Sequence, residues 1–400
     1  MVVSHDENFN FGSRLNPSPQ AKAAILQVIP ALETGGAERS ALDVAAALVR
    51  DGFAALVASE GGRLEHELAQ SGAEPIRMSA STKAPHVIFA NALKLRGIIA
   101  RRNVKLIHAR SRAPAWSALI AAKLADIPFV TTYHGIYNAS NALKRFYNAV
   151  MVRGDAVIAN SQWTEAHIRS EYRTPPKKLV VVPRGVDLER FDPAGVNPDR
   201  VAQMRAWWKV SDAEFVVLLP GRLTRWKGQG VLIGALAQLK ERGTLGRIHA
   251  VLAGDAQGRD AYEAELKAKI AAAGLADRVH IVGHVADMAT AYAASDVVVS
   301  ASTDPEAFGR VAAEAGAMAK PVIAADHGGA RETVLANVSG TLVAPGDSAA
   351  LARALEQIAA MPPETRAGMG AAGRAHIVRN YSKERMCSET LALYRSLIGD

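Results

Sequence analysis

Short apolar runs alternate with helical patterns along nearly the whole chain. In the first half, the predicted strands are Ala24–Pro30, Ala54–Ser59, Pro75–Met78, Leu106–Ala109, Phe129–Tyr133, Ala156–Ala159 and Leu179–Pro183. Helical stretches separate them, notably Gly35–Arg50, His86–Arg102, Ala113–Ala125, Ala142–Val152 and Thr164–Tyr172. Parallel strands need a crossover connection that is usually a helix, so this alternation predicts a doubly wound parallel sheet.

A second alternating series follows, without a close sequence repeat of the first. Its predicted strands are Phe215–Pro220, Ile248–Ala253, Val279–Val282, Val297–Ser300, Pro321–Ala324 and Thr341–Val343, with helices such as Val231–Arg242 and Ala261–Ala273. Between the two series, Pro193, Gly195 and Pro198 mark a linker. We therefore expect a loose tail over 1–21, one α/β domain over 22–190, a linker over 191–213, a second α/β domain over 214–380 and a terminal helix over 381–400.

Composition narrows the class of protein. A hydrophobic content of 49% over 400 residues is enough for two large cores. The single cysteine, Cys387, excludes an intramolecular disulfide and a zinc site of several cysteines, and it fits a reducing compartment. No apolar stretch is long enough to span a bilayer, and the polar N-terminus does not resemble a signal peptide. These features predict a cytoplasmic protein.

The excess of basic over acidic residues lies entirely in the first half of the chain. Residues 1–190 hold 24 Lys and Arg against 16 Asp and Glu, so they carry the entire net charge of +8. Ten of these bases, and no acid, lie between Pro75 and Ala125. Such a face suits nucleic acid, anionic lipid or an anionic substrate, or it is simply solvated. The absence of a nucleic-acid-binding motif argues against the first.

Two glutamates, Glu306 and Glu314, flank the predicted start of a helix that runs from about Phe308 to Ala319. The backbone amides of Ala307, Phe308 and Gly309 would then lie at an anion-binding helix N-terminus. Eight helical residues span roughly 12 Å, which suits two carboxylates that grip two parts of one long ligand. A glycosidase pair must instead flank one bond at about 5–9.5 Å.

Polar and glycine-rich turns follow several of the predicted strands. Gly221–Gly228 places Arg222 and Lys227 beside glycines, a combination that suits a diphosphate, although a basic turn is often only solvated. A Gly35-Gly36 turn follows the first strand, and His134 closes another. Further strand-end turns hold Gly254 and Asp255, and then Gly283, His284 and Val285. The chain has neither a Walker A sequence nor an Asp-x-Asp pair, so it predicts neither a P-loop kinase nor a metal.

Taken together, these motifs resemble the retaining glycosyltransferases of family 4. The resemblance rests on Gly35-Gly36-Ala37-Glu38, Arg222 with Lys227, and Glu306-Ala307-Phe308-Gly309 with Glu314, in the family's order and approximate spacing. It implies the GT-B architecture of two Rossmann-like domains that face a central cleft, with the last helix crossing back onto the first domain. One departure is Arg184, because the family more often has Asn before Gly-Val-Asp.

The resemblance also implies roles for individual residues. Arg222 and Lys227 would neutralise the leaving nucleoside diphosphate, and His134 would contact the donor sugar. Glu306 and the backbone of Ala307, Phe308, Gly309 and Val311 would hold that sugar, and Glu314 would bind the ribose. Gly35 and Gly36 would face the cleft. The nucleobase pocket would be formed by Gly254, Asp255, Gly283, His284 and Val285.

The expected activity is transfer of a hexosyl group from a UDP- or GDP-sugar to a glycan or lipid-linked acceptor, without a metal or other cofactor. The sequences of Pro305–Val311 and Ala325–Ala330 resemble those of bacterial enzymes that build lipopolysaccharide core or other envelope glycans. The basic first domain would then dock on the anionic inner face of the cytoplasmic membrane. Two alternatives remain open: a nucleotide-sugar 2-epimerase of the same architecture, and a non-catalytic sugar-nucleotide-binding protein.

Overall fold

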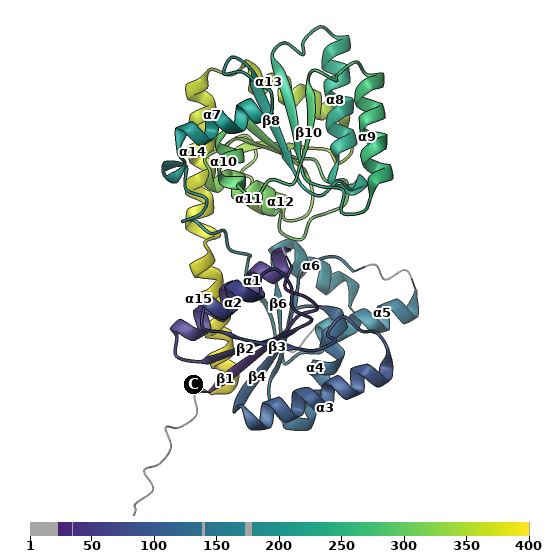
Figure 1. The fold of residues 1–400 in the computed structure, drawn as a ribbon, viewed down its shortest axis with the longest axis vertical. Helices are drawn as coiled ribbons and strands as arrows, with labels where there is room; N and C mark the ends of the chain where they lie inside the picture. The colour runs from purple at the N-terminus through teal and green to yellow at the C-terminus, as the bar shows by residue number, and fades with distance from the viewer. Residues whose placement is uncertain (1–22, 34, 138–140, 173–177, 400) are drawn as a thin grey trace, which may run out of the picture.

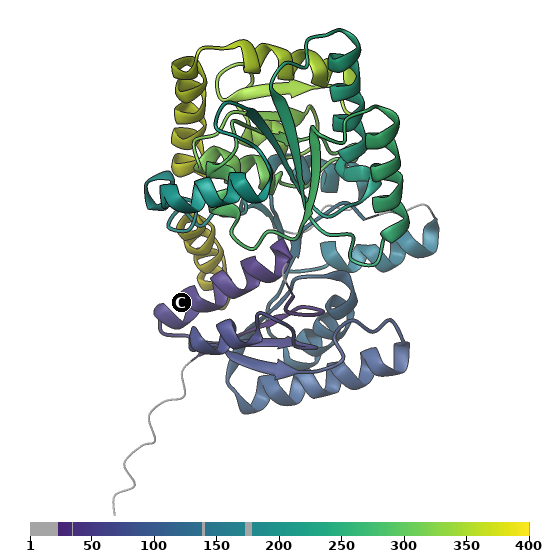
Figure 2. The same cartoon turned by 45° about the horizontal axis from the view of Figure 1, so that its top comes forward.

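The computed structural model describes residues 23–33, 35–137, 141–172 and 178–399, and the expected N-terminal tail lies outside these ranges. It contains two α/β domains stacked along the long axis of the molecule (Figure 1). Each domain is built on one parallel sheet, which confirms the predicted GT-B fold class. Figure 1 draws α1 (Gly36–Arg50) and α6 (Gln162–Glu171) at the edge of the N-terminal domain that faces the C-terminal domain, and Figure 2 shows the same two domains tilted so that the C-terminal domain comes forward.

The N-terminal domain has a seven-stranded sheet in the order β3-β2-β1-β4-β5-β6-β7. Its strands are β1 (Ala24–Val28), β2 (Ala54–Ser59), β3 (Glu74–Arg77), β4 (Val104–Ala109), β5 (Phe129–Tyr133), β6 (Ala156–Ala159) and β7 (Leu179–Val181). Successive side chains of β1 enter different cores: Ala24, Leu26 and Val28 pack on one face of the sheet and Ile25 on the other. Both faces are therefore covered, as a parallel sheet requires.

Helices form the two outer layers of this domain. One face packs against α3 and α4, and the other packs against α1 and the last helix of the chain, α15. The helices are α1 (Gly36–Arg50), α2 (Glu65–Gln70), α3 (Pro85–Arg101), α4 (Arg112–Ala125), α5 (Ala142–Asn148), a 3-10 turn η1 (Ala149–Val152) and α6 (Gln162–Glu171).

The C-terminal domain has a six-stranded sheet in the order β10-β9-β8-β11-β12-β13. Its strands are β8 (Phe215–Pro220), β9 (Ile248–Ala253), β10 (Val279–Gly283), β11 (Val297–Ser300), β12 (Val322–Ala325) and β13 (Gly340–Val343). Its helices are η2 (Pro193–Gly195), α7 (Pro198–Trp207), η3 (Arg225–Lys227), α8 (Gln229–Glu241), α9 (Asp260–Ala272), α10 (Met288–Ala293), α11 (Arg310–Ala317), α12 (Ala330–Thr333), α13 (Ser348–Ala360) and α14 (Pro363–Asn380). The last helix, α15 (Lys383–Ile398), belongs to the N-terminal core.

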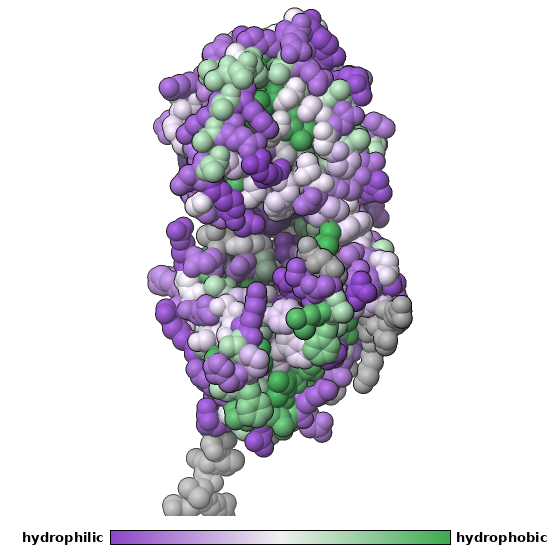
Figure 3. Space-filling model, turned by 90° about the vertical axis from the view of Figure 1, so that its right-hand side faces the viewer, coloured by the Kyte–Doolittle hydropathy of each residue, from purple (hydrophilic) through white to green (hydrophobic). Residues whose placement is uncertain are grey.

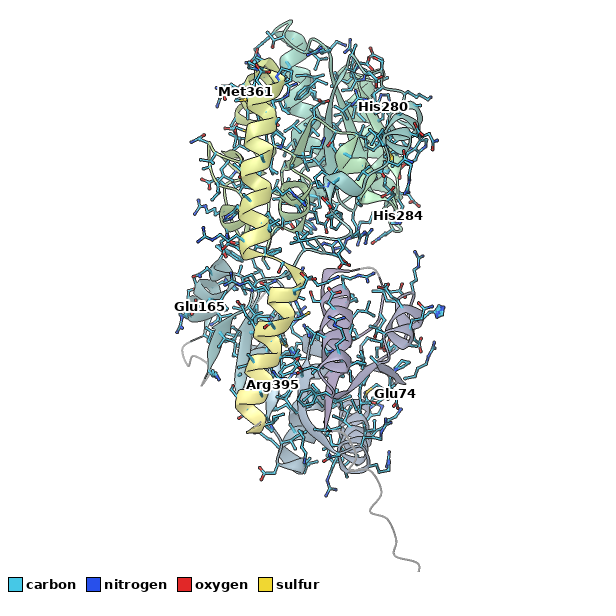
Figure 4. The ribbon with its side chains drawn as sticks, turned by 90° about the vertical axis from the view of Figure 1, so that its left-hand side faces the viewer. Glu74, Glu165, His280, His284, Met361 and Arg395 are labelled. Atoms are coloured by element: carbon cyan, nitrogen blue, oxygen red, sulfur yellow. The ribbon has the colours of Figure 1, made fainter. Side chains whose placement is uncertain are left out.

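The last two helices link the domains. The predicted break near Asn380 separates α14, which packs on α11 of the C-terminal domain, from α15, which packs on α1 and β4 of the N-terminal domain. Figure 4 shows this pair as one long yellow feature that runs along both domains. The thiol of Cys387 is buried in the N-terminal core, so its role is packing.

Some predicted boundaries were wrong. The helix expected from Phe308 to Ala319 begins at Arg310, because Gly309 has a left-handed backbone (φ 80°), and it ends at Ala317. Glu306 therefore lies outside the helix that holds Glu314, and the 12 Å estimate along one helix axis does not apply. The helix expected over Ala142–Val152 tightens into the 3-10 turn η1 after Asn148. Residues 191–213, expected as a linker, include α7, and Phe191, Trp208 and Val210 are buried in the C-terminal core.

Candidate active site between the domains

The loops that carry the predicted site residues leave the carboxyl ends of strands at the two switch points of the sheets. In the C-terminal sheet, β8 and β11 are neighbours, and their loops hold Arg222 to Lys227 and Glu306. In the N-terminal sheet, β1 and β4 are neighbours, and Gly35 follows β1. Open α/β sheets bind ligands at such points. A cleft of about 510 Å³ lies here, lined by both domains: Gly36, Arg39, Ser40, Asp43, Glu67, Arg184–Asp187, Arg190, Phe191, His284–Ala286, Met288, Arg310 and Glu314.

We call the loops at the carboxyl edge of each sheet the N-terminal and C-terminal walls of the site. In the C-terminal wall Lys227 and Glu306 form an ion pair, and neither is among the residues that line the cleft itself. Nζ of Lys227 lies 2.8 Å from Oε1 of Glu306, and the two side chains are only 14% and 15% exposed. The hydroxyl of Ser302 also donates to this carboxylate oxygen. Burial alone would raise the pKa of Glu306, but the charge and hydrogen bond of Lys227 and the bond from Ser302 hold it below its ordinary value. Glu306 is therefore ionised at neutral pH.

Arg222 lies five residues before Lys227, and it is exposed to solvent where Lys227 is mostly buried and paired. Within the described residues, Arg222 makes no ion pair. Only its carbonyl is engaged, accepting from the Gln229 amide at 2.9 Å. Its guanidinium is thus free to bind a ligand. The intervening Arg225 points elsewhere, since it pairs with Glu265 and lies 5.2 Å from the ring centre of Tyr262.

Glu314 is 8% exposed and is held at both carboxylate oxygens. The hydroxyl of Tyr292 donates to Oε2 at 2.9 Å, and Nε of Arg310, one helical turn earlier, donates to Oε1 at 2.8 Å. These contacts fix the carboxylate at the edge of the cleft. Among the flanking residues, Val311 is half-buried and Phe308 is 2% exposed in the domain core, so Phe308 offers a ligand its backbone only.

Two more loops complete the C-terminal wall. Gly254, after β9, approaches the carbonyl of Gly221 so closely that a Cβ would lie 2.0 Å from it, and Asp255 accepts a backbone bond from Leu223. Gly283 has a left-handed backbone (φ 69°) and turns the chain so that His284 and Val285 line the cleft. Figure 4 shows His284 on the edge of this domain that faces the N-terminal domain, whereas His280 lies farther away.

The N-terminal wall is built from the start of α1 and from the ends of β5 and β7. Gly35 caps α1, and Gly36 lines the cleft. His134 follows β5, and its Nδ1 lies 3.0 Å from Nη2 of Arg184. Burial, together with the charges of Arg184 and Arg110, lowers the pKa of His134 well below its ordinary value, so its imidazole is neutral. Arg184, the departure from the family pattern, thus lies inside the site.

The two walls are also joined directly, and of the residues involved only Ala307 was among the predicted site residues. The carboxylate of Glu332 accepts from the backbone amides of Gln162 and Trp163, at 3.0 and 2.7 Å, at the N-terminus of α6. The carbonyl of Ala307, next to Glu306, accepts from the hydroxyls of Ser161 and Thr164. These partners are 143–170 positions apart in sequence. The local signal that the sequence offers is Ser161 itself, a residue type that favours helix N-caps, whose hydroxyl oxygen accepts from the amide of Thr164.

Metal ligands do not cluster in the described ranges: no group of three or more His, Cys, Asp or Glu side chains there could hold an ion. That the transfer reaction needs no metal ion is a statement about the reaction itself, and it stays a prediction. The cations at the site come from the chain, namely Arg222, Lys227 and Arg184.

Models of known protein families match both the N-terminal and the C-terminal half of the chain. The model described as "Glycosyltransferase Family 4" matches residues 34–190, and the one described as "Glycosyl transferases group 1" matches residues 202–376. Together the two matched ranges contain all the predicted site residues, from Gly35 to Glu314.

Two curated relatives illustrate the range of names. A D-inositol 3-phosphate glycosyltransferase of Segniliparus rotundus is 35% identical over 62% of this chain, and the match spans 54% of its own length. The lipopolysaccharide core biosynthesis mannosyltransferase LpcC of Rhizobium leguminosarum bv. viciae is 28% identical over 75% of this chain and 81% of its own. The chain thus spans about half the length of the first of these relatives.

Two solved structures match nearly the whole chain. A glycosyltransferase from Rickettsia africae is 36% identical, with a TM-score of 0.87, over 95% of this chain and 99% of its own. HepE from Anabaena, solved in complex with UDP and glucose, is 28% identical, with a TM-score of 0.81, over 94% of this chain and 100% of its own. The two sheets and the cleft therefore belong to a known architecture.

Proposed function

This chain belongs to glycosyltransferase family 4, and we propose that it is a retaining enzyme that transfers a hexosyl group from a UDP- or GDP-sugar. The acceptor is a glycan or lipid-linked glycan of the bacterial envelope. The observation that carries the proposal is the mostly buried Lys227–Glu306 ion pair, whose two loops leave neighbouring strands at the switch point of the C-terminal sheet, together with Glu314 on the following helix, which lines the cleft.

Each charged group has a role that fits its surroundings. Arg222 and Lys227 neutralise the diphosphate as it departs, the electrostatic contribution that usually dominates such steps. Glu306 and the backbone that follows it hold the reacting sugar, and Glu314 accepts from the ribose hydroxyls. Neutral His134 positions the sugar from the opposite domain. The acceptor attacks from the face that the diphosphate leaves, and a diphosphate oxygen helps to take its proton.

The relatives support the finer parts of the proposal to different degrees. HepE binds UDP and glucose, which favours a nucleotide-sugar donor here. LpcC is named for lipopolysaccharide core synthesis, which favours an envelope acceptor. With chain-supplied cations at the diphosphate, the reaction proceeds without a divalent metal.

Helix α3 supplies a surface that suits an anionic membrane. Phe89 and Leu93 are 54% and 47% exposed on it, one helical turn apart, and exposed Arg96 and Arg101 belong to the same helix. Figure 3 shows hydrophobic residues gathered on the lower part of the N-terminal domain, on the side where Figure 1 draws α3. Apolar side chains bordered by cations are typical of interfacial helices. No helix within the described ranges is long and apolar enough to cross a bilayer.

The proposal is tested first by thermal shift with UDP- and GDP-sugars, because a ligand that binds only the native state raises the melting temperature. The donor that stabilises the protein is then incubated with and without acceptor glycans. Acceptor-dependent transfer with retained anomeric configuration supports the proposal. Conversion of the donor sugar without acceptor would identify the 2-epimerase, and binding without any turnover would identify a non-catalytic binding protein.

A further inference from the structure

Three cationic or polar side chains converge at the carboxyl edge of the N-terminal sheet. Arg110 follows β4, His134 follows β5 and Arg184 follows β7. Arg110 is 4% exposed and donates to the side-chain oxygen of Gln27 at 2.9 and 2.6 Å, so it is satisfied by a neutral group. The charge at this edge is therefore not cancelled by a carboxylate within hydrogen-bonding distance.

Arg184 and Arg310 approach each other across the turn at Gly36. A Cβ on Gly36 would lie 2.6 Å from Nη1 of Arg184 and 3.2 Å from Nη1 of Arg310. Two guanidinium groups, one from each domain, thus lie close to the backbone of Gly36. Arg310 is paired with Glu314, but Arg184 makes no ion pair within the described residues, and its one hydrogen-bond partner is His134.

Polar atoms at this point lack partners. Nε of Arg184 and Nε2 of His134 are buried, and neither has a hydrogen-bond partner in the part of the chain that the structure describes. Burial and the nearby Arg310 lower the pKa of Arg184 to about 10, so it keeps its charge at neutral pH. Glu38 and Glu306 act on it only from a distance, and Glu306 is already bound by Lys227 and Ser302. Arg184 is half-buried, and its hydrogen-bond partner within the described residues is a neutral imidazole and not a carboxylate, so an anion in the cleft would complete its interactions.

We propose that Arg184 binds an oxyanion of the nucleoside diphosphate and so adds a third cation to Arg222 and Lys227, supplied from the opposite domain. This inference rests on the proposed function, since it takes the donor to be a nucleotide sugar. The diphosphate is favoured because Arg184 lines the same cleft as Glu314 and the His284–Val285 loop, and because Arg310 extends from the helix of Glu314 toward it. An anion between the two guanidiniums would also draw the two domains together.

The test measures binding by calorimetry for nucleoside, nucleoside monophosphate and nucleoside diphosphate, in both the uracil and guanine series. Arg184→Asn removes the charge, and Arg184→Lys keeps the charge but not the planar fork. Loss of a charged hydrogen bond predicts a Kd for the diphosphate at least ~10-fold higher for Arg184→Asn, with Arg184→Lys in between. The Kd for the nucleoside should change less than about 2-fold. Arg169→Gln, which removes an exposed cation of the same domain that pairs with Glu165, is the matched control.

The outcomes separate the two proposals. Wild-type protein that binds no nucleoside diphosphate of either series would overturn the proposed function, and this inference with it. Equal affinity of wild type and both variants for the diphosphate would overturn only the role of Arg184. Equal losses for nucleoside and diphosphate would also overturn it, because a merely structural residue would not distinguish ligands by their phosphates. If Arg184→Asn does not fold, the Arg184→Lys series decides alone.

Discussion

The two walls of the cleft differ in how their charges are satisfied. In the C-terminal wall, Lys227 pairs with Glu306 and Arg310 pairs with Glu314. In the N-terminal wall, the hydrogen-bond partner of Arg184 among the described residues is neutral His134, and each of these two side chains keeps one buried nitrogen with no partner in that part of the chain. One wall is thus preorganised before a ligand arrives, whereas the other is completed by it. This difference suggests that the donor first binds to the C-terminal domain and that the N-terminal domain then closes on the bound anion.

The largest expected effect comes from the cations of the preorganised wall. Arg222→Ala and Lys227→Ala should each lower kcat by roughly 10²-fold or more, by analogy with the loss of one transition-state donor. The two variants should differ in stability. Exposed Arg222 should leave the melting temperature unchanged, whereas Lys227→Ala leaves mostly buried Glu306 without its ion pair and should cost about 1–3 kcal/mol. Kinetics and thermal unfolding of both variants, with Arg225→Ala as control, provide the check. Near-normal turnover in a folded variant would contradict the proposal that Arg222 and Lys227 neutralise the departing diphosphate.

The two glutamates should separate ground-state binding from catalysis. Glu306→Gln removes a contact to the sugar that reacts and should lower kcat by about 10- to 100-fold. Glu314→Gln removes a contact to the ribose, which is present throughout the reaction, and should mainly raise the donor KM. Steady-state kinetics on both variants measure the two parameters. Equal effects confined to KM would contradict this division of roles.

The contact between Glu332 and the start of α6 should help to hold the two domains together around a bound donor. Glu332→Ala removes two backbone-to-carboxylate hydrogen bonds to α6 and should weaken the closed arrangement, with a fall in kcat/KM of about 10-fold. Small-angle scattering with the bound donor should show a less compact molecule. Glu165→Gln, on the same helix but paired with Arg169, is the matched control. Unchanged compactness and activity would mean that this contact does not contribute to closure.

The sequence predicted the two-sheet architecture and located the segments that carry Arg222, Lys227, Glu306 and Glu314, and the reasons are local. Strands such as Phe215–Pro220 are continuous apolar runs, and the glutamates and basic loop are recognisable by spacing within short segments. The links between the walls could not be predicted in this way, because Glu332 meets Gln162 only through the packing of two domains. The helix start was misplaced because Gly309 adopts a left-handed backbone (φ 80°). The carbonyl of Ala307, just before it, also accepts from Ser161 and Thr164 of the other domain.

Asp43 gives the N-terminal wall a pH dependence. Burial raises the pKa of this cleft-lining carboxyl to about 6, despite the nearby charges of Arg39 and Lys383. The folded state therefore holds the proton more tightly than the unfolded state, so Asp43 costs stability as pH rises from about 4 to 6, and the cost stays constant above that. Asp43→Asn should stabilise the protein by about 1–2 kcal/mol at pH 7–8 and by nothing below pH 4. Urea unfolding at several pH values tests this. A pH-independent difference would contradict the assignment.

The smallest expected effect separates the outer surfaces of the two domains. Residues 1–190 carry the whole net charge of +8, and the remainder carries none. Of the basic residues around α3, Arg102 is paired with Glu74 and Lys94 donates to the carbonyl of Arg77, so Arg96, Arg101 and Lys105 are the cations left for a membrane. Each contributes about 1 kcal/mol near an anionic surface, screened by salt.

Co-sedimentation with liposomes should therefore show binding to anionic but not neutral vesicles, and high salt should weaken it. Replacing Arg96, Arg101 and Lys105 with Gln should reduce binding strongly, and replacing Phe89 and Leu93 with Ser should reduce it in a salt-independent way, since these side chains would bury apolar surface. Replacing Arg242, Arg247 and Lys267 of the C-terminal domain with Gln removes the same charge and should leave binding unchanged. If both triple variants lose binding equally, net charge alone acts and α3 is not a docking face. If wild type sediments with neither vesicle at low salt, α3 is a solvated helix, and the assignment of the cleft is unaffected.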